Sequence, residues 1–341
     1  FTPWSKGRMG SGWNPKSRKT WIWTSKEHAS LVTPQILFER RIMHLSMHNW
    51  MRAEPLKVTV ARLAKYGYKS IEISGEPEQF GLNGSKDTKQ LLDDYGLKCW
   101  GSVTLMLGER NLVAADAKKR AESVQYTKDC ITMVKELDGH EMTIVPATVG
   151  KITPDATPDE EWKWAVESMK EIYEHSEKAG VRLAIEPLNR FETYFLNRAE
   201  QAMALAEATG PNCGVCLDAF HINIEEADLY EAIRSTKGRL TDFHVAENNR
   251  MPAGHGDYDW KKVISTLQSI GYDGALTAEF VAPIDRTPAN HYKNALETNF
   301  DNVDISPEQL KFIIDHGSSI LTESFYDWLV EENAKTLLPL I

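Results

Sequence analysis

The feature that most constrains the fold is a strand-like segment followed by a helix-like segment, repeated along the chain from Met43 onward. Short β-rich runs occupy 43–47, 70–74, 99–105, 141–147, 181–187, 213–218, 240–246 and 275–280. Segments with apolar residues at three- and four-residue spacing lie between them, as at 56–67, 124–139 and 162–180. Strands that alternate with helices are typical of parallel strands joined by crossovers. Eight such units over about 250 residues predict a (β/α)8 barrel.

A doubly wound open sheet is the structural alternative, because it has the same alternation of strand and helix. That class usually carries a glycine-rich phosphate loop after its first strand. The segment after 43–47 reads HNWMRAEP and has no glycine. We therefore favour the barrel, as an α/β fold with an N-terminal extension and an extended C-terminal helical tail.

Composition excludes several kinds of partner. The chain has 341 residues and a formal net charge of −10, which argues against nucleic acid as the main partner. Four cysteines do not make a disulfide framework and fit a reducing compartment. No apolar run approaches the roughly 18 residues that a membrane span needs. We expect a cytoplasmic protein with no membrane partner.

The first 42 residues differ from the rest of the chain. They hold eight Lys and Arg against two Glu, a balance of +6, so the remaining 299 residues carry −16. They also contain four tryptophans among Gly, Ser and Pro, without helical or strand periodicity and without the apolar core of a secretory signal. We expect residues 1–42 to be a leader that is poorly ordered or packed on another subunit. Residues 43–341 would then form a single catalytic domain.

Polar residues end four of the last predicted strands. These are Glu186 in AIEP, Asp218 in CLDAF, His244 in DFHVA and Glu279 in TAEF, separated by 32, 26 and 35 residues. In a barrel the carboxyl ends of the strands form the active-site face, so consecutive strands would bring these side chains to one rim. Three buried carboxylates repel each other unless a cation neutralises them. Oxygen-rich ligation with one imidazole favours Mn²⁺, with Mg²⁺ or Co²⁺ as alternatives.

The motifs IEPLNRFET, LDAFHINIEEAD, FHVAENNR and AEF resemble those of the ketose 3-epimerases, the tagatose/psicose group of the xylose isomerase-like sugar phosphate isomerase/epimerase superfamily. The resemblance covers about residues 43–282 and is specific mainly from 181 to 280. It implies a TIM barrel in which the four strand-end residues bind the metal. It also implies that Glu186 and Glu279 act as the acid/base pair, and that Glu192, His221 and Arg250 contact substrate oxygens.

The chemistry of such a site can be stated from the residues. A divalent cation bound by a carbonyl and a neighbouring hydroxyl stabilises the enediolate that forms when a proton beside a ketone is removed. Two carboxylates on opposite faces can take a proton from one side and return one from the other. His221 could orient a hydroxyl or serve as a base, since its ordinary pKa is about 6.5. A keto-sugar 3-epimerase or isomerase, in a homo-oligomer, is the first hypothesis.

Two departures from the epimerase pattern keep a second hypothesis open. The chain continues for about 60 residues beyond Glu279, and the early strand ends SMHNWM and ISGEPEQF differ from the small-sugar pocket of that group. The catalytic α subunit of C-glycoside deglycosidases is similar in its metal-binding pattern. That resemblance implies a lyase acting on 3-keto-C-glycosides with a small β-rich partner subunit. A non-sugar metal barrel or a binding module is the third hypothesis.

Weaker features have simpler interpretations. Cys213 and Cys216 have CxxC spacing, but an odd step along a strand puts them on opposite faces, which favours core packing. GHGDYDW (254–260) indicates a loop leading into a helix. His48 and Glu76, at the ends of the first two strands, could line the pocket or be ordinary polar residues of the rim. The acidic residues of NIEEA (223–227) predict the start of a helix after an AFH turn.

Overall fold

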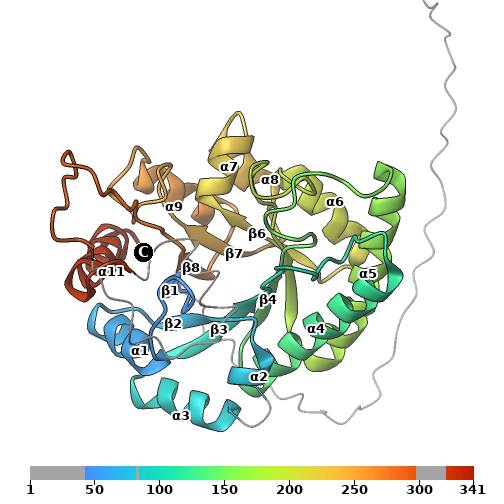
Figure 1. Cartoon of the computed structure of the whole chain (residues 1–341), viewed down its shortest axis with the longest axis horizontal. Helices are drawn as coiled ribbons and strands as arrows, with labels where there is room; N and C mark the ends of the chain where they lie inside the picture. Colours follow the sequence, from blue (N-terminus) through green and yellow to red (C-terminus); the bar gives the residue numbers. More distant parts are fainter. Residues whose placement is uncertain (1–42, 82–83, 297–319) are drawn as a thin grey trace, which may run out of the picture. The chain divides into compact units, whose positions relative to one another are not determined.

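The computed structural model describes residues 43–81, 84–296 and 320–341, and its eight strands confirm the predicted barrel (Figure 1). Neighbouring strands are parallel in the order β1-β8-β7-β6-β5-β4-β3-β2. The strands are β1 (His44–Met47), β2 (Ser70–Ser74), β3 (Lys98–Val103), β4 (Glu141–Ile144), β5 (Arg182–Ile185), β6 (Gly214–Asp218), β7 (Leu240–Val245) and β8 (Ala275–Ala278). Each strand begins within one residue of its predicted start.

Backbone contacts between β1 and β2 bring the two ends of this sheet together. The Lys69 amide donates to the Leu45 carbonyl at 3.0 Å, and the Asn49 amide donates to the Glu72 carbonyl at 3.3 Å. His48 and Glu72 form an isolated parallel bridge at the same place. The sheet is therefore a nearly closed barrel whose seam runs past His48 and Glu72.

Helices surround the strands and join them in sequence (Figure 1). They are α1 (Leu56–Lys65), α2 (Pro77–Phe80), α3 (Ser85–Asp94), α4 (Ala117–Glu136), α5 (Pro158–Ala179), α6 (Ala199–Thr209), α7 (Ala219–Glu225), α8 (Leu229–Ser235), α9 (Trp260–Ser269) and α11 (Glu323–Leu337), followed by the 3₁₀ turn η2 (Leu338–Leu340). Their apolar faces pack on outward-facing strand residues such as Leu45, Ile73 and Phe243, all fully buried.

The prediction that a helix starts at the acidic pair near 225 is wrong. Helix α7 begins at Ala219, directly after β6, because the Asp218 carboxylate accepts the Phe220 amide at 2.8 Å and caps the first turn. The acidic residues come at the end of α7 instead. Glu226 accepts the Ala199 amide at 2.8 Å and so ties this end of α7 to the start of α6.

The interior of the barrel is unusually polar. Inward positions are most often branched apolar residues in such barrels. Here Glu72, Glu141, Thr143, Asp242 and Thr277 are buried, on strands β2, β4, β7 and β8. A polar interior layer therefore lies below the strand ends that the sequence singled out.

The C-terminal helix α11 packs against α1, as Figure 1 shows at the edge of the barrel. Arg62 of α1 is buried and pairs with Glu54 and with Asp327 of α11, and its guanidinium lies 5.0 Å from the Tyr326 ring. The buried Asn333 donates to the Tyr68 hydroxyl at 3.0 Å and accepts the Ala253 amide at 3.1 Å. The helical part of the predicted C-terminal tail is thus an integral part of the domain.

The remaining expectations about the ends of the chain stay predictions. The leader at 1–42 and the tail segment at 297–319 lie outside the described residues. Among the described helices, none is long and apolar enough to cross a membrane.

Candidate active site

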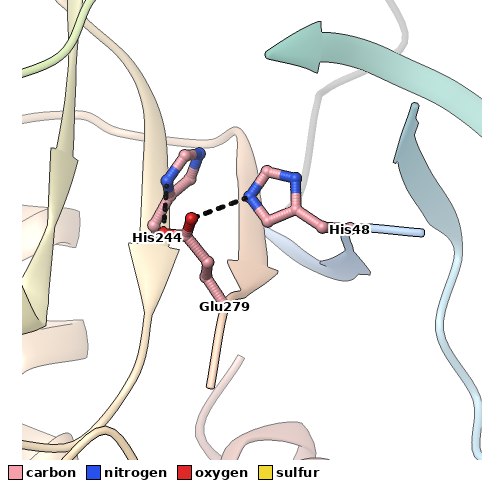
Figure 2. A group of neighbouring side chains, drawn as sticks. All are labelled: His48, His244 and Glu279. Atoms are coloured by element: carbon pink, nitrogen blue, oxygen red, sulfur yellow. Dashed lines mark hydrogen bonds and ion pairs between the residues drawn. The ribbon is translucent and has the colours of Figure 1, made fainter. Parts of the chain in front are cut away.

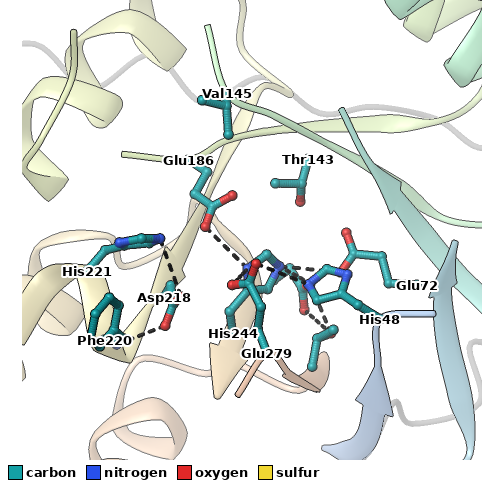
Figure 3. A network of polar contacts seen from close by, with 12 residues as sticks. His48, Glu72, Thr143, Val145, Glu186, Asp218, Phe220, His221, His244 and Glu279 are labelled. Atoms are coloured by element: carbon teal, nitrogen blue, oxygen red, sulfur yellow. Dashed lines mark hydrogen bonds and ion pairs between the residues drawn. The ribbon is translucent and has the colours of Figure 1, made fainter. Parts of the chain in front are cut away.

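The four predicted ligand residues gather at the carboxyl ends of the last four strands. Glu186 and Glu279 come directly after β5 and β8, whereas Asp218 and His244 are the last or next-to-last residues of β6 and β7. All four residues are at most 6% exposed, and Figure 3 shows their side chains directed toward one another. Successive strands of a parallel barrel therefore place them as the spacing predicts.

His244 is the centre of this cluster. Its Nδ1 lies 3.3 Å from Glu186 Oε1 and 3.1 Å from Glu279 Oε2. The two carboxylates approach the same ring nitrogen from the ends of β5 and β8, although 93 positions separate them in the sequence. A group that binds at His244 Nδ1 would meet both carboxylates.

Asp218 is joined to the same cluster through other residues. Glu186, Asp218, His221 and Glu279 each offer one ligand atom, and these atoms all lie within 4.8 Å of one another. His244 offers a ligand atom within 4.8 Å of Glu186 in one such cluster and of Glu279 in another, but it shares no cluster with Asp218. The four predicted ligand residues are therefore spread over three overlapping clusters: one joins Asp218 to both glutamates, and two others join His244 to one glutamate each.

His221 is held by residues of the loop after β5. Its Nδ1 lies 2.8 Å from Asn189 Nδ2, and its Nε2 lies 3.6 Å from Asp218 Oδ2. Asn189 Nδ2 also donates to Glu192 Oε1 at 2.8 Å, and that oxygen is 3.9 Å from His221 Nδ1. The predicted substrate contacts His221 and Glu192 are thus neighbours, linked by an asparagine that the sequence reading did not select.

Arg250 reaches the site from the loop after β7. Its guanidinium pairs with Asp218, lies 3.6 Å from Glu279 Oε2 and stacks 4.5 Å from the Phe220 ring. Its backbone adopts φ +63°, which is uncommon for a residue other than glycine. A strained backbone at a charged residue inside a pocket is typical of functional sites.

A buried carboxylate stabilises the loop that carries Arg250. Glu247 accepts hydrogen bonds from the Gly254 amide at 2.7 Å, the Trp260 indole at 2.7 Å and the Tyr258 amide at 3.2 Å. The predicted loop at GHGDYDW leads into α9 as expected, with Asp259 capping the helix through the Lys262 amide. The loop is therefore folded around Glu247.

Burial and neighbouring charges shift the pKa values of these groups in opposite directions. Burial raises the pKa of Asp218 to about 7, although Arg250 and His221 oppose the shift. Burial also raises the pKa of Glu186, against the influence of His244. For Glu279, Arg250 and His244 outweigh burial and hold the pKa well below its usual range. Two glutamates at one imidazole with opposite shifts are suited to acid and base roles.

The site pocket has one polar wall and one apolar wall. The polar wall consists of Glu186, Glu192, His221, Arg250 and Glu279. The apolar wall comes from Trp50, Val103, Leu105, Met106, Leu107, Val145, Val149 and Leu188. Glu76 does not line this pocket; it accepts the Ser74 hydroxyl at 2.8 Å.

Three residues that the sequence reading missed or left undecided belong to the cluster. His48 of the β1 end, Glu72 of β2 and Asp242 of β7 are all fully buried beside His244. Figure 2 shows His48 and His244 on either side of Glu279. The available signal was a charged residue at an inward position of an apolar strand, as in SIEIS and LTDFHV, rather than at its end.

The residues fit a divalent cation. Three buried carboxylates face one guanidinium, that of Arg250, and Glu186 Oε1 has no hydrogen-bond partner among the described residues. Carboxylate oxygens with imidazole nitrogen are suitable ligands for Mn²⁺, Mg²⁺ or Co²⁺. Cys213 and Cys216 are free and buried, so the described cysteines give no disulfide pair. Cys213 packs in the apolar core as expected, whereas the Cys216 Sγ lies within 4.8 Å of ligand atoms of Glu186 and His244.

The chain belongs to the xylose isomerase-like TIM barrel family, whose pattern matches residues 60–303. It is 30% identical over 226 residues to an L-ribulose 3-epimerase of Mesorhizobium japonicum, covering 66% of this chain and 75% of that protein. It is 29% identical over 231 residues to a D-psicose 3-epimerase of Ruminiclostridium cellulolyticum, and the match covers 65% of this chain and 77% of that protein. The resemblance to ketose 3-epimerases is thereby confirmed.

Solved structures agree with the fold. A D-allulose 3-epimerase from Methylomonas in complex with D-allulose superposes with a TM-score of 0.72 at 21% identity, covering 88% of this chain and 98% of that one. Together the relatives place the chain among enzymes of the sugar epimerase and isomerase type. They give no support for a C-glycoside lyase or for a small partner subunit.

Proposed function

We propose that the protein is a divalent-metal-dependent ketose 3-epimerase. The observation that carries the proposal is the placement of two buried glutamates, Glu186 and Glu279, at 3.3 and 3.1 Å from His244 Nδ1. A binding module would not need two carboxylates at one imidazole, whereas inversion of a carbon beside a ketone needs a proton acceptor and a proton donor. The epimerase relatives support the same reaction type.

The carboxylates provide the proton transfers in this proposal. One of the pair removes the proton from the carbon next to the ketone, and the other returns a proton to the opposite face. Glu279 is suited to accept a proton because the Arg250 guanidinium lies 3.6 Å from its Oε2, and Glu186 is suited to donate because it is buried and makes no ion pair with a lysine or arginine among the described residues. The roles exchange for the reverse reaction, as microscopic reversibility requires.

Glu186, Asp218, His244 and Glu279 would hold the cation. A bound Mn²⁺ would supply Lewis-acid stabilisation of the negative charge that develops on the ketone oxygen. His221, Glu192 and Arg250 would bind sugar hydroxyls, since all three line the pocket beside the glutamates. Asn189 and the Glu247 loop would keep these contacts in place.

The substrate we propose is a free ketose such as L-ribulose or D-psicose, the sugars named in the relatives. We also propose a homo-oligomer, which size-exclusion chromatography with light scattering would test against a monomer of 38.6 kDa.

A chelation experiment tests the proposed function. The purified chain is stripped with EDTA, reloaded with Mn²⁺ and incubated with L-ribulose or D-psicose. We expect the 3-epimer to form only after reloading, and to disappear in the Glu186→Gln variant. Glu141→Gln is the matched control, since Glu141 is an equally buried carboxylate on β4 outside the pocket. Epimer formation by Glu186→Gln at the control's rate would contradict the proposal.

A further inference from the structure

One buried carboxylate in the barrel interior contacts two imidazoles of the site. Glu72 Oε2 lies 3.4 Å from His48 Nδ1 and 3.3 Å from His244 Nε2 (Figure 3). Both distances exceed that of an ordinary N–H···O hydrogen bond, and both are short enough to become one with a small side-chain adjustment. Glu72 therefore lies where it can bind two rings with one group.

The opposite nitrogens of the same rings are directed at Glu279. His244 Nδ1 is 3.1 Å from Glu279 Oε2, and His48 Nε2 is 4.0 Å from Glu279 Oε1 (Figure 2). The two rings are 4.7 Å apart in an edge-to-face arrangement. Glu72, His244, Glu279 and His48 thus form a closed ring of contacts, with one glutamate below the imidazoles and the other at the pocket.

Glu72 is a better candidate than Asp242 to accept a hydrogen bond from His244 Nε2. Asp242 Oδ2 also lies 3.4 Å from His244 Nε2, but Asp242 already accepts the Thr277 hydroxyl at 3.1 Å and the Tyr272 hydroxyl at 3.4 Å. Neither oxygen of Glu72 has a hydrogen-bond partner among the described residues. Burial of a carboxyl group that accepts no hydrogen bond lowers the stability of the folded state. Such a group in a folded protein therefore calls for an explanation, which here is its contact with the two imidazoles.

The position of Glu72 in the fold makes the contact rigid. Its backbone forms the β1–β2 bridge with His48, and its carbonyl accepts the Asn49 amide at 3.3 Å. The main chain therefore fixes Glu72 and His48 relative to each other independently of their side chains. Substitution of the Glu72 side chain therefore changes the group that faces the two imidazoles but keeps the backbone contacts between β1 and β2.

We propose that Glu72 is a positioning residue that accepts the Nδ1–H of His48 and the Nε2–H of His244, so that His244 Nδ1, which donates to Glu279 in the metal-free protein, can give up its proton when a cation binds there. This inference rests on the proposed function for its consequence, because an unprotonated imidazole nitrogen is what a divalent cation binds. Outer carboxylates that fix the ring of a ligating histidine commonly change metal affinity about 10- to 100-fold when removed.

The tautomers of the two rings test the inference in the metal-free protein. Ring ¹⁵N resonances of histidine-labelled protein are recorded at alkaline pH, where an unperturbed carboxyl group is ionised. We expect His48 to carry its proton on Nδ1 and His244 to carry one on Nε2. A His48 ring protonated on Nε2 would overturn the inference without any variant having to fold.

Metal affinity gives the second measurement. Glu72→Gln keeps the shape of the side chain but removes its negative charge and replaces one oxygen with an NH₂ group, so it should hold the two ring N–H groups less strongly. We expect the Mn²⁺ dissociation constant to rise at least about tenfold over that of Glu141→Gln, the matched buried control. Equal affinities in the two variants, with unchanged ring resonances, contradict the inference. Failure of the unmodified protein to bind Mn²⁺, with both tautomers as expected, counts against the proposed function and supports the role of Glu72.

Discussion

The carboxylates of Glu186 and Glu279 meet at one atom, His244 Nδ1, at 3.3 and 3.1 Å. They enter from β5 and β8, which have two strands between them in the barrel. This convergence is the structural basis of the proposed proton transfers, because each carboxylate can reach a group bound at His244 from its own side.

Glu186→Gln and Glu279→Gln should each lower kcat by about 10²- to 10⁴-fold, the usual contribution of a general acid or base. The amide cannot accept the proton, while its size preserves the packing of a buried side chain. Steady-state kinetics with Mn²⁺ and a ketose measures the effect. Circular dichroism of each variant serves as the control for folding, and a loss of less than tenfold in both variants would exclude the acid/base assignment.

Arg250→Lys should lower kcat/KM by about 10- to 100-fold. Lysine cannot reproduce the two-sided contact of the guanidinium with Asp218 and Glu279 or its stacking on Phe220. Kinetics of Arg190→Lys provide the comparison, since Arg190 makes a similar guanidinium–carboxylate pair with Glu225 on an exposed part of the surface. Equal kinetics for the two variants would show that Arg250 is only a structural residue.

Most of the fold could be predicted from the sequence because each strand is short, apolar and followed by an amphipathic helix. The ligand candidates were found because strand ends are recognisable as the last apolar residue before a polar one. The inward layer was missed because Glu72 and Asp242 sit inside their strands, where only closure of the barrel shows that they face His244. The left-handed backbone of Arg250 has no signal in the sequence, since it follows from the fold of the Glu247 loop.

Asp327 should make stability depend on pH in the acidic range. Its Oδ2 accepts Lys65 Nζ at 2.9 Å and the Tyr66 hydroxyl at 3.1 Å, while Oδ1 accepts Arg62. Although burial opposes the effect, these contacts lower the pKa of the Asp327 carboxyl. Its contribution is therefore complete above the unfolded value of about 3.9 and is lost as the pH falls through the folded value.

Asp327→Asn should accordingly lower the free energy of unfolding at neutral pH by about 1 kcal/mol. The difference from the unmodified chain should shrink at acidic pH, where the carboxyl is protonated in both states. Urea unfolding at a series of pH values measures it. A constant difference across the series would contradict the assigned origin.

Asn333→Ala should destabilise the domain by about 1–3 kcal/mol, because it leaves the buried Ala253 amide without an acceptor and the Tyr68 hydroxyl without a donor. Thermal unfolding monitored by circular dichroism gives the shift. Substitution of the exposed Glu323 on the same helix to Ala is the control, and equal melting temperatures for the two variants would argue against the bridging role of Asn333.

Solvent deuterium incorporation tests the central claim most directly. The Mn²⁺-loaded protein is incubated with L-ribulose or D-psicose in D₂O, and the sugars are analysed by NMR and mass spectrometry. We predict one deuterium at C3 of the epimerised product, because the returned proton comes from a carboxylate that exchanges with solvent. Formation of neither the 3-epimer nor a C3-deuterated sugar would contradict proton transfer by Glu186 and Glu279.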